Sequence, residues 1–172
     1  MNLKKFLDLS SGKWFSQRTN YLLGDDDEVE NSKADITIEL ISTDDSRAVQ
    51  LCQKHRLDPQ LSLGGTVQSW DNSVDWGKPK QQGSSIIVFV SNLMSDRIGK
   101  LIRPGDTKIC GRYVLGEDEA LTLIIETEDM YAEERQWFAS NNLRMRTTMV
   151  KYSNGLNQTS FYSEIRKVPP KE

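Results

Sequence analysis

The stretch from residue 133 to 147 gathers the side chains of this sequence that could do chemistry. Glu133 and Glu134 precede a Ser-Asn-Asn turn signal, and Arg144 and Arg146 follow it. A guanidinium is a forked donor that pairs well with carboxylates, and a carboxylate can exchange protons or stabilise a cation. Because Arg144 and Arg146 are two residues apart, a strand would place both on one face. The pattern predicts a hairpin with unusually charged arms.

The length of the turn decides which residues of the first arm join the two arginines. A two-residue turn would pair Trp137 with Arg146. We favour a three-residue turn over residues 140–142, with an Asn in the left-handed position, which sets three residues beside the arginines: Glu134, Gln136 and Phe138. The alternative interpretation is a charge ladder on the outer face, where an exposed pair contributes under about 1 kcal/mol.

Arg18 is a second candidate, on the segment that begins Ser11-Gly12-Lys13-Trp14. These residues follow a short helical pattern and resemble the Gly-x-Trp motif of lipocalins, in which the tryptophan plugs the closed end of a β-barrel. If Trp14 points inward, strand alternation turns Ser16, Arg18 and Asn20 inward too. A buried guanidinium is costly unless it is paired, so Arg18 must meet a protein carboxylate, water or an anionic ligand. An internal salt bridge and a ligand site both fit this sequence.

Two tryptophans, Trp70 and Trp76, flank the polar turn Asp71-Asn72-Ser73-Val74-Asp75. At the mouth of a barrel they would supply flat apolar surface for a ring system. Packing in the protein core is the alternative interpretation.

We do not expect a metal site. The two cysteines, Cys52 and Cys110, lie too far apart in sequence for a zinc motif, and the single histidine, His55, stands among charged helix residues. A solvated helix position fits His55 better than catalysis.

Strands dominate the elements that must position these residues. We expect helices over 4–9 and 47–57, and strands over 14–23, 34–40, 66–70, 84–90, 100–103, 108–115, 121–128, 131–139, 143–152 and 158–167. Strand follows strand without the helices that a parallel sheet needs. The sequence predicts an all-β fold with one or two helices, an antiparallel up-and-down barrel in a single domain of residues 1–172.

Charge and hydropathy exclude several classes of function. A net charge of -3 offers no basic field for nucleic acid. The longest apolar run, residues 86–90, is too short to insert into a membrane. The N-terminal segment lacks the apolar core of a signal peptide, so we expect a cytoplasmic protein.

Several longer motifs resemble the S-type phycobiliprotein lyases of the CpcS/CpeS family. They occur in order over nearly the whole chain: GKWFSQRT at 12–19, DP at 58–59, WDNSVDW at 70–76, GRY at 111–113, ALTLI at 120–124, EERQWFAS at 133–140, NLRMRT at 142–147 and SFYSEIR at 160–166. The resemblance implies a lipocalin- or fatty-acid-binding-protein-like barrel of about ten strands. It also implies an enzyme that transfers an open-chain tetrapyrrole, a bilin, to a cysteine thiol of a phycobiliprotein subunit.

The resemblance implies roles for particular residues. Glu134 and Arg144 would be catalytic, with Glu134 holding the bilin protonated. The bilin would bind to Arg18, Trp70, Trp76, Glu134, Trp137, Arg144 and Arg146. The acceptor supplies the thiol, so Cys52 and Cys110 are expected to be structural.

The resemblance also bears on ligands and partners. The bilin would be a transferred substrate rather than a permanently bound cofactor; we favour phycoerythrobilin, with phycocyanobilin as the alternative. The expected partner is an apo-subunit of the phycoerythrin or phycocyanin type, with a bilin-synthesising reductase and a second copy of the chain as further candidates. A lipocalin-like carrier that binds a bilin without transferring it is the competing function.

Overall fold

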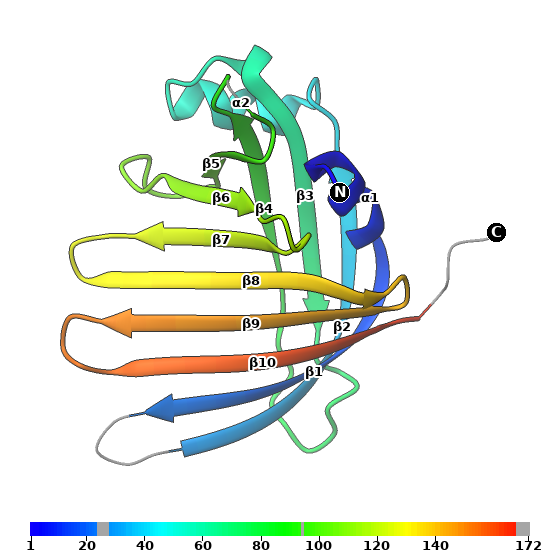
Figure 1. Ribbon diagram of the computed structural model, residues 1–172. Helices are drawn as coiled ribbons and strands as arrows, with labels where there is room; N and C mark the ends of the chain where they lie inside the picture. Colours follow the sequence, from blue (N-terminus) through cyan, green and yellow to red (C-terminus); the bar gives the residue numbers. More distant parts are fainter. Residues whose placement is uncertain (24–27, 94, 168–172) are drawn as a thin grey trace.

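The computed structural model describes residues 1–23, 28–93 and 95–167 (Figure 1). Among these residues the elements are, in chain order, α1 (Leu3–Ser10), β1 (Gly12–Leu23), β2 (Glu28–Ile41), α2 (Ser46–Lys54), a 3-10 turn η1 (Pro59–Leu61), β3 (Ser62–Asp71), β4 (Gln82–Ser91), β5 (Ile98–Ile102), β6 (Gly111–Leu115), β7 (Leu121–Glu126), β8 (Met130–Ser140), β9 (Leu143–Tyr152) and β10 (Asn157–Arg166). None of the described helices is long and apolar enough to cross a membrane.

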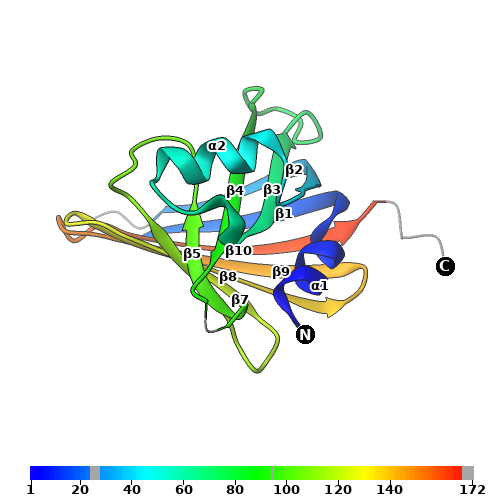
Figure 2. The same ribbon diagram turned by 90° about the horizontal axis from the view of Figure 1, so that it is seen from above.

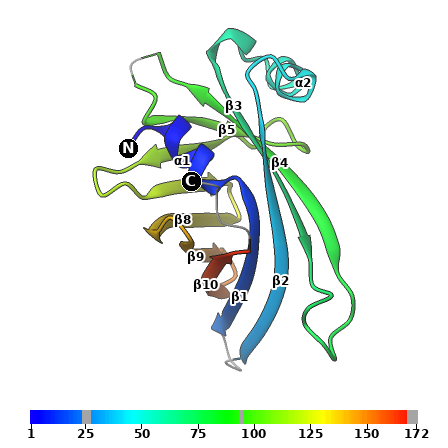
Figure 3. The ribbon, with the colours of Figure 1, turned by 90° about the vertical axis from the view of Figure 1, so that its right-hand side faces the viewer.

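The strands form one closed antiparallel barrel. Each strand pairs with its neighbours along the chain, and β1 pairs with β10 to close the ring. Strands β8, β9 and β10 lie side by side on one wall, and β2, β3 and β4 form the other (Figures 1 and 3). The predicted up-and-down barrel of about ten strands is confirmed.

Helix α1 closes one end of the barrel (Figure 2). The Asn2 side chain caps it by accepting a hydrogen bond from the Lys5 backbone N–H at 2.9 Å. The apolar face of α1, which includes Phe6, packs into the largest core cluster, and Phe6 meets Phe138 edge to face. Just beyond the helix, Trp14 is fully buried and donates its indole N–H to the Ser10 carbonyl at 2.9 Å. The predicted tryptophan plug is therefore present.

Arg166 holds the buried Trp14 side chain in place from outside the cavity. Its guanidinium donates to the carbonyls of Leu9, Ser11 and Asn141 at 2.5, 2.7 and 3.1 Å and lies 4.1 Å from the centre of the Trp14 ring. Charge-assisted hydrogen bonds and cation–π contact together tie the last strand to the start of the first.

Helix α2 covers the outer face of β3 and β4, where Ala48, Leu51 and Cys52 pack in a second core cluster. Asp45 caps the helix by accepting from the Arg47 backbone N–H at 2.9 Å. The helix stops at Lys54, earlier than the expected residue 57, and Arg56 takes a left-handed φ of 56°.

Only β7 and β9 begin at the expected residues, and the shifts of β2 and β6 have a local reason. Strand β2 starts at Glu28 rather than at residue 34, which the alternation missed because Val29 is the one apolar residue among the first six. Strand β6 starts at Gly111 rather than 108, because Asp106 accepts from the backbone of Lys108 and forms a turn.

Candidate functional site

The inner side of β1 carries polar residues beyond Trp14. Ser16 and Asn20 are buried, and Arg18 lines a cavity in the barrel. Phe15 and Gln17 alternate with them on the other face, so the predicted inward orientation of Arg18 is confirmed.

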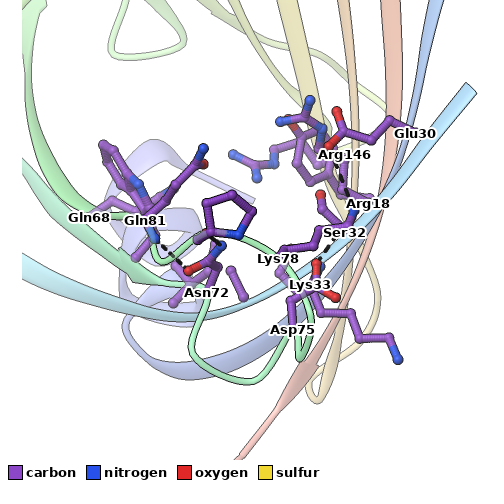
Figure 4. Close-up of a pocket in the computed structure, with 16 residues that line it drawn as sticks. Arg18, Glu30, Ser32, Lys33, Gln68, Asn72, Asp75, Lys78, Gln81 and Arg146 are labelled. Carbon is purple, nitrogen blue, oxygen red and sulfur yellow. Dashed lines mark hydrogen bonds and ion pairs between the residues drawn. The ribbon is translucent and has the colours of Figure 1, made fainter. Parts of the chain in front are cut away.

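A cavity of about 500 Å³ opens at the mouth of the barrel (Figure 4). Arg18 and Arg146 lie on one side of it, and Gln68 and Gln81 lie on the opposite side. A deeper cavity of about 210 Å³ shares Gln68 and Arg146 with it and reaches Glu134. The two volumes together fall in the range of about 300–1,000 Å³ that is usual for small-molecule sites.

The β8–β9 hairpin adopts the favoured phase. Phe138 pairs with Arg144, and Gln136 pairs with Arg146, so Glu134 lies on the same inward face. The turn itself differs from the expected three-residue loop: residues 141–142 form a two-residue turn, and a β-bulge between Phe138 and Ser140 supplies the offset. The alternative charge ladder on the outer face is wrong for the two arginines, which are buried.

Glu164 of β10 joins the two arginines into one buried network. Its carboxylate accepts hydrogen bonds from Arg144 Nε at 2.5 Å and from Ser16 Oγ at 3.2 Å, and it forms an ion pair with Arg146 Nη2 at 3.2 Å. Glu134 contacts Arg146 Nη1 at 3.4 Å from the cavity side. The side chain of Glu164 is 0% exposed, so the network has its own internal counter-ion.

Our sequence-based predictions did not include Glu164 in the site. The alternation of Tyr162, Glu164 and Arg166 along β10 was readable, but only the pairing with β1 and β9 shows that this face is inward. Burial alone would raise the pKa of Glu164, but the guanidiniums of Arg146 and Arg144 outweigh it and hold the pKa below its usual value.

Several guanidinium nitrogens in the cavity lack a partner. Arg18 Nε, Arg144 Nη2 and Arg146 Nε are buried without a hydrogen bond to any part of the chain that the structure describes. The Arg146 guanidinium also lies 3.9 Å from the centre of the Tyr162 ring, and Arg18 lies 6.0 Å from the same ring. Unbonded buried donors are rare in folded proteins, so these nitrogens call for an acceptor such as water or a ligand.

Trp70 stands at the wall of the mouth cavity with 36% of its surface exposed. Gly83 pairs with it across β3 and β4, and a Cβ on Gly83 would lie 2.3 Å from the indole ring. The ring therefore rests directly on the backbone of β4, which only a glycine at this position permits.

The other two tryptophans lie away from the cavity. Trp76 is 91% exposed on the β3–β4 loop and lines neither cavity. Trp137 follows Gln136 on β8, so it points to the outer face, where it lines a separate hollow with Arg135 and Thr147. Neither ring therefore lines a cavity together with Arg18, Arg144 or Arg146.

The described residues contain no group of three or more metal-ligating side chains close enough to hold an ion. Burial raises the pKa of the Cys52 and Cys110 thiols. Neither sulfur lines the two cavities.

The sequence model of the family described as CpeS-like protein matches residues 2–167. The chain belongs to this family. The relatives include chromophore lyases CpcS/CpeS, so the chain is a member of an enzyme family of the lyase class.

Relatives match the CpeS-like chain along nearly its full length. A chromophore lyase CpcS/CpeS of Thermosynechococcus vestitus is 42% identical over 170 residues, which cover 96% of this chain and 93% of the relative. The phycocyanobilin lyase subunit CpcS of Picosynechococcus is 34% identical, over 95% of this chain and 85% of the relative. The solved S-type phycobiliprotein lyase CPES from Guillardia theta has the same fold, with a TM-score of 0.84 and 27% identity over 98% of this chain and 94% of that chain.

Proposed function

We propose that this CpeS-like chain binds an open-chain tetrapyrrole in its barrel and catalyses thioether attachment of that bilin to a cysteine of a phycobiliprotein subunit. The observation that carries the proposal is the set of buried, unbonded guanidinium nitrogens on Arg18, Arg144 and Arg146 beside the cavity. A bilin carries two propionates, whose oxygens are suitable acceptors for forked guanidinium donors. The names of the relatives given above support the same chemistry.

Different residues of the cavity would bind different parts of the bilin. Arg18 and Arg146, which both line the mouth, would hold one propionate, and Arg144 offers its free Nη2 to the other from the deeper cavity. Trp70 would stack on a pyrrole ring. Glu134, which lines the deeper cavity, would accept hydrogen bonds from pyrrole N–H groups and stabilise the protonated ring system.

Catalysis would come from presentation of the bilin. The acceptor thiolate forms a C–S bond to an electrophilic carbon on the A ring, the double bond of that carbon is consumed, and a proton adds to the neighbouring ring carbon. No oxidant, reductant or nucleophile from this chain enters the balance. Holding the bilin extended and correctly faced converts an encounter in solution into an oriented reaction.

The test is co-expression of the chain with bilin-synthesising enzymes and candidate apo-subunits. We propose phycoerythrobilin as the bilin, with phycocyanobilin as the second arm of the experiment, and a bilin-synthesising reductase as the supplier. The expected result is a subunit that carries a covalent, fluorescent chromophore after denaturing electrophoresis. Binding of bilin without transfer to any subunit would instead identify a carrier.

A further inference from the structure

Glu164, the buried carboxylate that pairs with the arginines, affects which protonation state of the ligand the cavity accepts. Three guanidiniums, those of Arg18, Arg144 and Arg146, face or adjoin the cavities, and two carboxylates, those of Glu134 and Glu164, lie among them. These five side chains, which we call the arginine cluster, therefore carry one net positive charge. In a buried site with low effective dielectric, such an imbalance acts strongly on a bound charge.

The charges at the rim do not change this balance. Glu30, Asp75, Lys33 and Lys78 line the mouth as two acids and two bases, and Lys78 contacts both Glu30 and Asp75. Arg103 reaches the deeper cavity from an exposed position, where water screens it.

Arg166 of β10 is also buried and positively charged, but it does not line either cavity. Its donors bond to three backbone carbonyls at the closed end, and its guanidinium lies over the Trp14 ring, as does that of Arg144. The charge of Arg166 is the same in all the variants compared below, so it does not affect the differences among them.

We propose that Glu164 is a positioning residue: without touching the ligand, it sets the charge of the arginine cluster so that the cavity matches a tetrapyrrole with two carboxylates and one protonated ring system. The inference rests on the proposed function. Two propionates and one protonated ring system leave the ligand with one net negative charge, which the cluster neutralises. The unprotonated ligand, with two negative charges, would leave one uncompensated charge in the barrel.

Glu164 suits this role because it lies behind the arginines. Its side chain is fully buried, lines neither cavity and is held by Arg144, Arg146 and Ser16. It accepts a hydrogen bond from Arg144 Nε and pairs ionically with Arg146 Nη2, while Arg144 Nη2 and Arg146 Nε remain unbonded. It therefore also selects which donors of the two arginines remain for the ligand.

The test is a charge series read by the visible spectrum of bound phycocyanobilin across pH. Glu164→Gln makes the cluster more positive and should lower the pKa of the bound bilin by about one unit. Arg144→Gln makes the cluster less positive and should raise that pKa. The double variant Glu164→Gln/Arg144→Gln restores the original charge and should return the pKa to that of the unaltered chain. Glu126→Gln, which removes an exposed outer carboxylate, is the control and should leave the pKa unchanged.

A purely structural role for Glu164 gives a different pattern. Two results would overturn the proposal that the net charge of the cluster sets the pKa of the bilin. One is a double variant shifted as much as Glu164→Gln, and the other is a shift of the pKa in the same direction by Arg144→Gln and Glu164→Gln. Should Glu164→Gln fail to fold, the rise for Arg144→Gln and its reversal in the double variant still decide the question. If the unaltered chain binds phycoerythrobilin but not phycocyanobilin, the same series is read with phycoerythrobilin. If it binds neither bilin, the proposed function itself fails, and the proposal for Glu164 fails with it.

Discussion

At the scale of single residues, Arg18 lines the cavity and has few bonds to the fold. Its Nε is buried and unbonded, and it forms no ion pair with the part of the chain that the structure describes. Arg166, by contrast, bonds to three backbone carbonyls. Under the proposed function, the arginine of β1 would therefore serve binding and the arginine of the adjacent strand β10 would serve stability.

Replacing Arg18 with Met should separate these two effects. We expect bilin affinity to fall by about 1.5–3 kcal/mol, the range for hydrogen bonds to charged groups, while the free energy of unfolding stays the same or rises. Titration with phycocyanobilin and urea denaturation measure the two quantities. Arg166→Met is the matched variant and should lower the free energy of unfolding. If Arg18→Met destabilises the chain as much as Arg166→Met, Arg18 is a structural residue.

Glu134 and Glu133 form a matched pair of carboxylates on opposite faces of β8. Glu134 faces the deeper cavity, whereas Glu133 accepts a hydrogen bond from the Tyr131 hydroxyl at 2.7 Å on the outer face. Glu134→Gln should shift the visible band of the bound bilin to shorter wavelength and slow transfer by about 10²–10⁴. Glu133→Gln should change neither the band nor the rate. Equal spectra and rates for the two variants would remove Glu134 from the mechanism.

The two thiols of the chain should be dispensable for transfer. Burial raises the pKa of both, which disfavours the reactive thiolate. A Cys52→Ala/Cys110→Ser double variant should retain the transfer rate of the unaltered chain, measured as covalent bilin on the acceptor subunit. A folded double variant that binds bilin but does not transfer it would contradict the mechanism in which only the acceptor provides the thiol.

At the scale of elements, the β3–β4 pair holds Trp70 against the cavity. Any side chain at Gly83 would displace the indole ring, since the nearest ring atom lies 2.3 Å from an added Cβ. Gly83→Ala should therefore weaken bilin binding nearly as much as Trp70→Ala does. The double variant should bind no worse than Trp70→Ala alone, because the clash disappears with the ring. Additive losses of affinity would show that Gly83 acts independently of Trp70.

The strands were predictable where apolar and polar residues alternate, and less so where both faces are polar. The alternation of apolar and polar residues predicted both ends of β9, Leu143 and Tyr152, correctly. It missed the first residues of β2, which border the polar mouth. The hairpin phase was predicted, but the β-bulge that produces it was not, because Ala139 gives no local sign of a bulge.

A site residue was predictable where the sequence of its own strand is enough to assign the face on which it lies. Arg18 could be placed inward from the phase of Trp14, and Arg144 and Arg146 could be placed on one face of their strand, but the sequence left open whether that face is inward. Glu164 required the pairing of β10 with two neighbours. Trp76 and Trp137 were expected in the site from resemblance, and the structure places them elsewhere, on a loop and on the outer face.

At the scale of the whole molecule, the buried network makes stability depend on pH. The pKa of Glu164 is lower in the folded chain than its ordinary value of 4.5, so its charge stabilises the fold above that value. This stabilisation is lost as the pH falls through the lowered, folded-state pKa. The free energy of unfolding should decrease from about pH 5 downward, as measured by urea denaturation.

The double variant Glu164→Gln/Arg144→Gln provides the comparison. It replaces a buried charged pair with two neutral amides, so its free energy of unfolding should depend less steeply on pH in the acid range. The same acid dependence in both chains would mean that other carboxylates cause it.

The closure of the barrel joins the two ends of the chain. Ser16 and Glu164 are 148 residues apart, and Asn20 bonds to Ser160 at a separation of 140 residues. Contacts between such distant residues form late in folding because a long loop must close first. The inner wall that holds the ligand is therefore completed only after β10 has been synthesised and has paired with β1. A ribosome-bound chain that lacks β10 has neither Glu164 nor a closed barrel, so under the proposed function bilin capture has to wait until β10 has been synthesised.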